Sequence, residues 1–74
     1  MIREHDSAVL TVDLPAQGLR RGDVGMVVMV HGGGRGFEVE FVTLGGTTHA
    51  VVTLDAAQLR PVADRNIAHA RELA

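Results

Sequence analysis

The sequence lacks cysteine, lysine, tryptophan and tyrosine altogether. Without cysteine, the chain can form no disulfide, no thiolate zinc site and no thiol nucleophile. Without lysine, its seven basic residues are all arginines, and nine acidic residues leave a formal net charge of −2. This balance gives little long-range attraction to nucleic acid or anionic lipid. Aromatic anchors, which dominate many binding hot spots, are limited to two phenylalanines.

Long hydrophobic runs are also missing. The longest, from Met26 to Val30, is far too short to span a bilayer, and the opening stretch MIREHDSAVL lacks the layout of a signal peptide. We therefore expect a cytoplasmic protein with no membrane partner. A chain of 74 residues is expected to form one domain. It buries only about 60% of the surface that its unfolded form exposes, so a homo-oligomer would add stability that a small core lacks.

Five short segments rich in β-branched residues predict strands. They are SAVLTV (7–12), VGMVVMVH (24–31), FEVEFV (37–42), TTHAVVTL (47–54) and RPV (60–62). In the third segment, phenylalanine and valine alternate with glutamate, which indicates one buried face and one solvated face. The second runs without alternation, which indicates burial on both faces or a strongly bent strand. Pro61 suits the edge of a sheet, because it cannot donate to a ladder.

Regular turn signals and a long early loop, DLPAQGLRRGD (13–23), predict a mostly β fold: a small five-stranded SH3-like barrel over residues 5–62. Asp55 is expected to cap one helical turn at DAAQL. Residues 63–74 form a tail that predicts a short C-terminal helix, with Ile67, Ala70 and Leu73 roughly on one face. A lone helix of this length is marginal in water, so it would dock on its own barrel, on a second copy or on another protein.

The run GGGRG (32–36) has two interpretations. Glycine-rich loops cradle phosphates when their amides approach the anion and a helix follows, but no GxGxxG or GK[ST] spacing can be placed here and a strand follows. Glycine also meets the positive φ of a hairpin turn without steric cost. The run therefore predicts a hairpin connection, with Arg35 exposed at its tip as a contact for a partner.

Acid–base and metal chemistry have few candidates. Glu38 and Glu40 share one face of a predicted strand. Catalysis by paired carboxylates needs a concave, partly desolvated site, and alternating acids opposite phenylalanines are usually the solvated side. The histidines are scattered, although His31 and His49 lie on separate predicted strands and could meet in space. We expect no catalytic residue, no metal site and no cofactor.

The long loop offers the best binding candidates. A loop fixed by proline and glycine is where small barrels usually present binding residues, which selects Arg20, Arg21 and Asp23. The alternative is an exposed charged loop in which Asp23 bonds its own turn backbone. Arg60, just before Pro61, is as well suited to pairing with a neighbouring acid as to contacting a partner.

Two stretches, HDSAVLTVDLPAQGLRRGDVGMVV and FEVEFVTLGGTTHAVVTLDAAQLRPV, resemble the bacterial domain-of-unknown-function family four-nine-two-six over residues 5–62. The ordered set DLP, GL, GDVG, VEF and AVVTL…LRPV carries the resemblance. GDxGxVV is also similar to the opening of KOW-type and other SH3-like barrels. The resemblance implies the barrel fold, brings no catalytic residues, and implies binding or neutralisation of a larger neighbouring protein, toxins included. Two features depart from the pattern: Met26 stands in place of threonine, and the hairpin GGGRG lacks the aromatic or polar residues expected there. If the partner contacts that hairpin, the resemblance implies a different specificity for this chain.

These patterns predict a non-enzymatic protein-binding module, of antitoxin, immunity or accessory type, that acts through shape and edge-strand complementarity. The expected contact surface is the loop from Leu14 to Asp23 together with the hairpin from Gly32 to Gly36, with the C-terminal tail as an arm. Two alternatives stay open. One is a KOW-like nucleic-acid-binding barrel, against which the charge argues, and the other is a small non-catalytic subunit of an enzyme complex.

Overall fold

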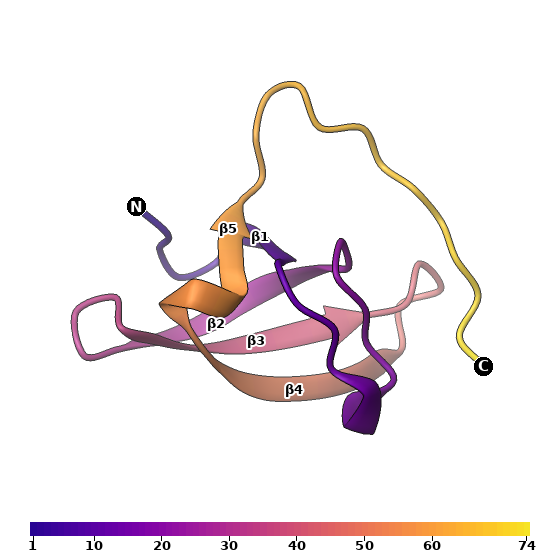
Figure 1. Cartoon of the computed structure of the whole chain (residues 1–74), viewed down its shortest axis with the longest axis horizontal. Helices are drawn as coiled ribbons and strands as arrows, with labels where there is room; N and C mark the ends of the chain where they lie inside the picture. Colours follow the sequence, from indigo (N-terminus) through magenta and orange to yellow (C-terminus); the bar gives the residue numbers. More distant parts are fainter.

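The computed structural model describes all 74 residues, which form one antiparallel sheet with two short 3-10 turns (Figure 1). In chain order the elements are β1 (Ser7–Leu10), η1 (Pro15–Gln17), β2 (Val24–His31), β3 (Gly36–Val42), β4 (Thr48–Asp55), η2 (Ala56–Gln58) and β5 (Leu59–Pro61). The strands lie in the order β4-β3-β2-β1-β5. The sheet is not closed, because β4 and β5 are its two edges and do not pair with each other. The prediction of a mostly β fold with five strands is confirmed.

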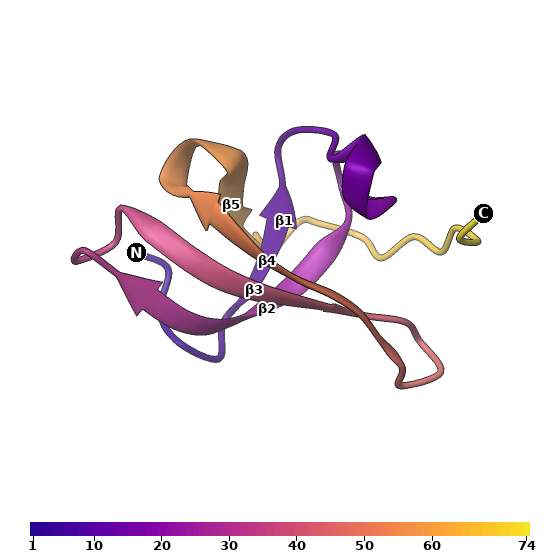
Figure 2. The same cartoon turned by 90° about the horizontal axis from the view of Figure 1, so that it is seen from below.

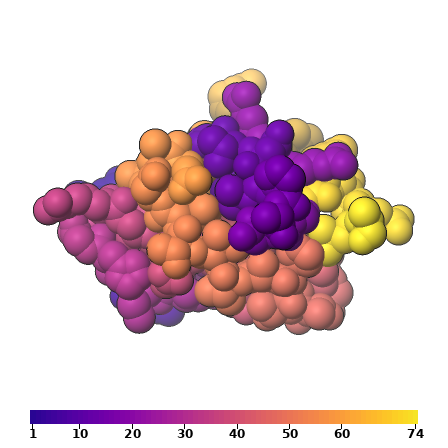
Figure 3. All heavy atoms as spheres, turned by 60° about the horizontal axis from the view of Figure 1, so that its bottom comes forward, coloured from indigo at the N-terminus to yellow at the C-terminus, as the bar shows by residue number.

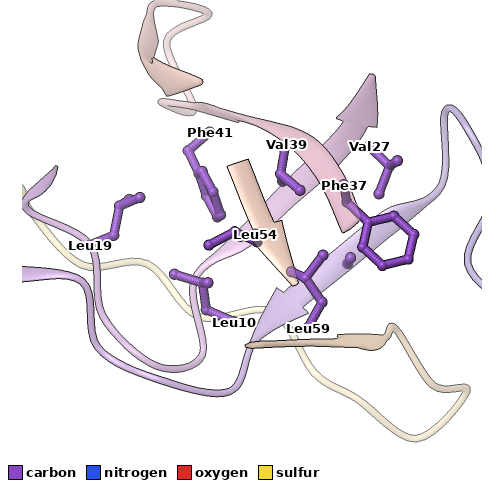
Figure 4. Packing of buried hydrophobic residues seen from close by; sticks show 9 residues of the cluster. Leu10, Leu19, Val27, Phe37, Val39, Phe41, Leu54 and Leu59 are labelled. Carbon is purple, nitrogen blue, oxygen red and sulfur yellow. The ribbon is translucent and has the colours of Figure 1, made fainter. Parts of the chain in front are cut away.

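The core lies on the inner side of this curled sheet (Figures 2 and 4). β3 contributes Phe37, Val39 and Phe41, which are at most 3% exposed, as the alternation predicts. The glutamates between them lie on the other face and are half-buried. Burial of one such side chain contributes about 1.5–3 kcal/mol. The other four strands and the loop after β1 complete the cluster with Ala8, Leu10, Leu19, Val27, Leu54 and Leu59.

Of the two expectations for the unbroken apolar run of β2, burial on both faces is wrong, and the strand is instead bent at a bulge. Gly25 and Val27 are buried, whereas Met26 is 38% exposed and Met29 is 48% exposed. The register with β3 shifts between Val27 and Met29. This β-bulge inserts Val28 as an extra residue and bends the strand, which conceals the period of two in the sequence.

The glycine run forms the hairpin turn between β2 and β3, as predicted. Gly32, Gly33 and Gly34 have positive φ values of 57°, 69° and 107°, where other residues are strained. The N–H of Arg35 donates to the carbonyl oxygen of His31 at 3.1 Å and closes the turn.

The connection between β4 and β5 is a capping box around η2. The side chain of Asp55 accepts from the N–H of Ala57 at 2.9 Å, and the side chain of Gln58 accepts from the N–H of Asp55 at 3.0 Å. The predicted N-cap is confirmed. Pro61 ends β5 at the edge of the sheet, also as predicted.

The predicted C-terminal helix is absent. Residues 62–74 contain no helix or strand and pass around the body as an arm (Figure 1). Ile67 is 94% exposed, so the expected apolar face is not covered, and an undocked helix this short does not recover its nucleation cost. A turn in which Ala63 and Asn66 exchange hydrogen bonds of 2.9 and 3.0 Å begins the arm. No helix anywhere in the structure has the length and apolar content of a bilayer crossing.

Candidate functional site

The loop between β1 and β2 is folded back on itself and tied to the core. Leu14 and Leu19 exchange two backbone hydrogen bonds of 3.0 and 3.1 Å, and Leu19 is only 4% exposed within the core cluster. Gly18, with a φ of 67°, ends η1 in the left-handed conformation that glycine adopts without strain. At the base of the loop, backbone hydrogen bonds of 2.9 Å join Leu10 to Gly22 and to Asp23. The loop is therefore a fixed platform.

The three predicted binding residues of this loop have different environments. The carboxylate of Asp23 accepts from the backbone N–H of Arg20 at 2.8 Å, and Asp23 donates its own N–H to the carbonyl oxygen of Arg20 at 3.0 Å. The interpretation that Asp23 bonds its own turn is therefore confirmed. The N–H of Arg21 donates to Asp13 at 2.8 Å. The guanidinium groups of Arg20 and Arg21 make no hydrogen bond or ion pair within the chain, so both are free to contact a partner.

The C-terminal arm reaches this platform through Arg71. Its Nε and Nη2 donate to the two carboxylate oxygens of Asp23 at 2.9 and 2.6 Å, and Nη2 also donates to the carbonyl oxygen of Gly18 at 3.0 Å. The side chains of Arg71 and Asp23 are only 23% and 18% exposed. The hydrogen bonds from Arg71, helped by the N–H of Arg20, hold the pKa of Asp23 below its ordinary value. The Asp23 carboxylate in turn raises the pKa of Arg71.

A shallow hollow of about 430 Å³ lies between the loop and the arm. Figure 3 shows the loop and the arm side by side on one face, with β4 beneath them. The Nε2 of His49, at the start of β4, lies 2.7 Å from the carbonyl oxygen of Gln17 and ties the loop to the sheet. The lining includes Asp13, Gly18, Arg20, His49, Arg71 and Leu73.

The other predicted contact residues lie elsewhere. Arg35 is in the β2–β3 hairpin, at the end of the molecule opposite to the η1 loop (Figure 1), so the loop and this hairpin do not form one continuous surface. Arg60 donates to the carbonyl oxygen of Pro61 at 3.1 Å and to the side chain of Asn66 at 2.9 Å. It therefore stabilises the first turn of the arm and does not pair with an acidic residue.

The outer face of the sheet carries a small polar network. Both carboxylate oxygens of Glu38 accept from the Thr53 hydroxyl, at 2.8 and 2.9 Å, and one lies 2.9 Å from Nε2 of His31. The Thr53 hydroxyl and, next, the His31 ring lower the pKa of Glu38. Glu40 accepts from the hydroxyl of Thr48 at 2.6 Å. These bonds satisfy the two glutamates separately and do not couple them as an acid–base pair.

The scattered histidines do not converge. His31 bonds Glu38 near the hairpin, whereas His49 bonds Gln17 in the loop. No three histidine, aspartate or glutamate side chains are placed together so that they could hold a metal ion.

Arg71 is the residue of this site that the sequence reasoning missed. It lies 48 positions from Asp23 in the chain, and nothing in the local sequence distinguishes it from Arg65, which is in the same arm and makes no hydrogen bond. The apolar spacing of the tail instead favoured a helix.

Comparisons with known proteins match the body of the chain alone. The model of a family described as domain of unknown function, DUF4926, matches residues 4–61. No curated protein and no solved structure matches the chain significantly. The matched range contains every strand and the loop, and it ends before the arm that carries Arg71.

Proposed function

We propose that this chain, which belongs to the DUF4926 family of domains of unknown function, is a non-enzymatic, cytoplasmic module that binds another protein through an SH3-like barrel. The strand order β4-β3-β2-β1-β5 supports the barrel assignment, because the first strand pairs with both the second and the last. The long loop after β1 and the 3-10 turn between β4 and β5 also fit that fold.

The open edge at β4 is the observation that carries the binding proposal. β4 is eight residues long and bonds only β3, so one side of its backbone is unpaired. An edge of this kind accepts an added strand through main-chain hydrogen bonds. Val51 on this strand is 57% exposed and lies opposite Glu40 of β3, which in turn lies opposite the exposed Met26 of β2. An exposed valine beside an unpaired edge offers an added strand both main-chain hydrogen bonds and an apolar contact.

The loop supplies the second element of the proposed contact surface. Arg20 and Arg21 project free guanidinium groups from a backbone that hydrogen bonds hold in place. Because the backbone is fixed, contact with a partner costs side-chain entropy but little loop ordering. Arg35 and Arg60 are not part of this surface.

A tagged pull-down from native lysate after nuclease treatment, read by mass spectrometry, would identify the partner. One protein at near-equal stoichiometry supports the proposal. Loss of every captured species with nuclease would instead favour the KOW-like nucleic-acid reading, and a large metal-containing enzyme chain would favour the accessory-subunit reading.

Replacement of both loop arginines then tests the contact surface. Arg20→Ala with Arg21→Ala should weaken partner binding about tenfold or more in titration calorimetry, since arginine is a frequent hot-spot residue, while the fold is kept. Arg3→Ala with Arg65→Ala removes the same charge elsewhere and serves as the matched control. Equal affinity for the two double variants would reject the loop as the contact surface.

A further inference from the structure

The loop presents a receptor for a guanidinium group that is assembled without the arm. The carboxylate of Asp23 is oriented by the N–H of Arg20, and the carbonyl of Gly18 is positioned by the left-handed end of η1. The backbone hydrogen bonds of the loop are made to β1, to η2 or within the loop itself, and none is made to the arm. The two oxygens of one carboxylate and a nearby carbonyl match the planar donor fork of arginine.

The arm is held at this receptor by one side chain. Arg71 is the only half-buried residue between Val62 and Ala74; all the others are exposed. No other side chain of residues 67–74 makes a hydrogen bond or an ion pair. The segment that links the receptor to β5 has no helix or strand. Release of the contacts of Arg71 therefore frees the arm from residue 67 onward.

We propose that the Asp23–Gly18 receptor is a recognition site for an extended partner segment that carries an arginine, and that Arg71 is its intramolecular occupant. This inference rests on the proposed protein-binding function and names the chemistry of the partner. The arm shows how such a segment lies: without secondary structure, along the loop, with one guanidinium inserted between Gly18 and Asp23. The hollow beside it, lined by Arg20 and His49, receives the residues that follow.

Tethering makes the arm a competitor of the partner. A segment joined by a short flexible linker acts at an effective concentration on the order of mM, so it shields the receptor from weak ligands. A partner with further contacts to the β4 edge or the loop arginines displaces it. The arm thus sets an affinity threshold for binding.

The test uses the full chain and a synthetic peptide with the sequence of residues 62–74, VADRNIAHARELA. The peptide is titrated into ¹⁵N-labelled wild-type chain and into the Arg71→Ala chain, and the amide signals of Gly18, Arg20 and Asp23 are followed by NMR. We expect saturable shifts with the Arg71→Ala chain and at least about threefold weaker binding to the wild type, because the tethered arm competes.

Two altered peptides, each lacking one arginine, test whether the receptor recognises Arg71 itself. The peptide with Arg71→Ala should give no saturable shifts, whereas the peptide with Arg65→Ala should bind like the parent. Similar titrations for the two altered peptides, or none for the parent, would overturn the proposal. Both peptides are titrated into the same protein variant, Arg71→Ala. The comparison therefore requires no substitution at Asp23, which could disturb folding.

Sedimentation velocity separates the intramolecular arm from an exchanged one. A wild-type dimer that becomes a monomer in the Arg71→Ala chain would show that the arm docks on a second copy, and would overturn the intramolecular assignment. If the peptide titration fails but the pull-down recovers a protein partner, the arginine receptor is rejected and the proposed protein-binding function is kept. A successful titration without any captured protein would leave the receptor and remove the proposed function.

Discussion

Gly25 on β2 packs so closely against Val39 on β3 that no side chain fits between them. A Cβ atom on Gly25 would lie 2.6 Å from the Cγ1 of Val39 and 2.9 Å from the Cε1 of Phe41. Val39 has no exposed surface, and Phe41 is 3% exposed. The missing side chain lets two core residues of β3 reach across the inner face of β2.

Gly25→Ala should lower the free energy of unfolding by about 1–3 kcal/mol, the usual cost of overpacking a filled core. Urea denaturation of the variant and the wild type measures this difference. Gly45→Ala is the control, because its Cβ would meet only the Thr43 hydroxyl oxygen, at 3.8 Å, and the backbone there is not left-handed. A loss of the same size in both variants would contradict the packing argument.

The ion pair between Asp23 and Arg71 should make stability depend on acidity. The pKa of Asp23 is depressed in the folded chain, so its contribution is fully present above the unfolded value of about 3.9 and is lost as the pH falls through the folded pKa. Asp23→Asn should therefore destabilise the chain at neutral pH, by less than about 1 kcal/mol because partly exposed pairs are screened, and this effect should shrink as the pH falls through the folded pKa. Chemical denaturation at several pH values tests this, and a difference that does not change with pH would refute it.

The hydroxyl of Thr53 should dominate the acidity of Glu38. It is the largest cause of the lowered pKa of Glu38, ahead of His31, so Thr53→Val should raise that pKa more than His31→Asn does. The stability linked to Glu38 is present above its unfolded pKa and is lost as the pH falls through the folded one. A ¹³C NMR titration of the carboxyl group measures both shifts, and the reverse ranking would show that the histidine governs the site.

The capping box at η2 should contribute measurably to stability. Asp55→Ala removes the acceptor of the Ala57 N–H and should cost about 0.5–2 kcal/mol, as loss of an N-cap does. Thermal unfolding measures it. Asp64→Ala is the matched control, because Asp64 lies in the exposed arm and makes no hydrogen bond or ion pair. If the two variants have the same melting temperature, the cap does not stabilise the connection between β4 and β5.

Local patterns determined most of the sheet. Alternation along β3 predicted which side chains enter the core, since successive residues of a strand point to opposite faces. The glycines at 32–34 predicted the hairpin, and Asp55 predicted the capped turn, because each effect is confined to a few neighbouring residues. The proline, glycine and arginine content of the long loop selects it as a candidate binding surface, which stays a prediction.

Only the tertiary structure decided features that depend on residues far apart in the chain. The bulge at Val28 depends on the register with β3, so the sequence of β2 alone does not show which of its side chains are exposed. Arg71 bonds Asp23, which lies 48 positions away in the chain. The apolar spacing of the tail cannot predict this contact. Propensity acts between neighbours, whereas register and ion pairing are settled when the whole sheet curls around its core.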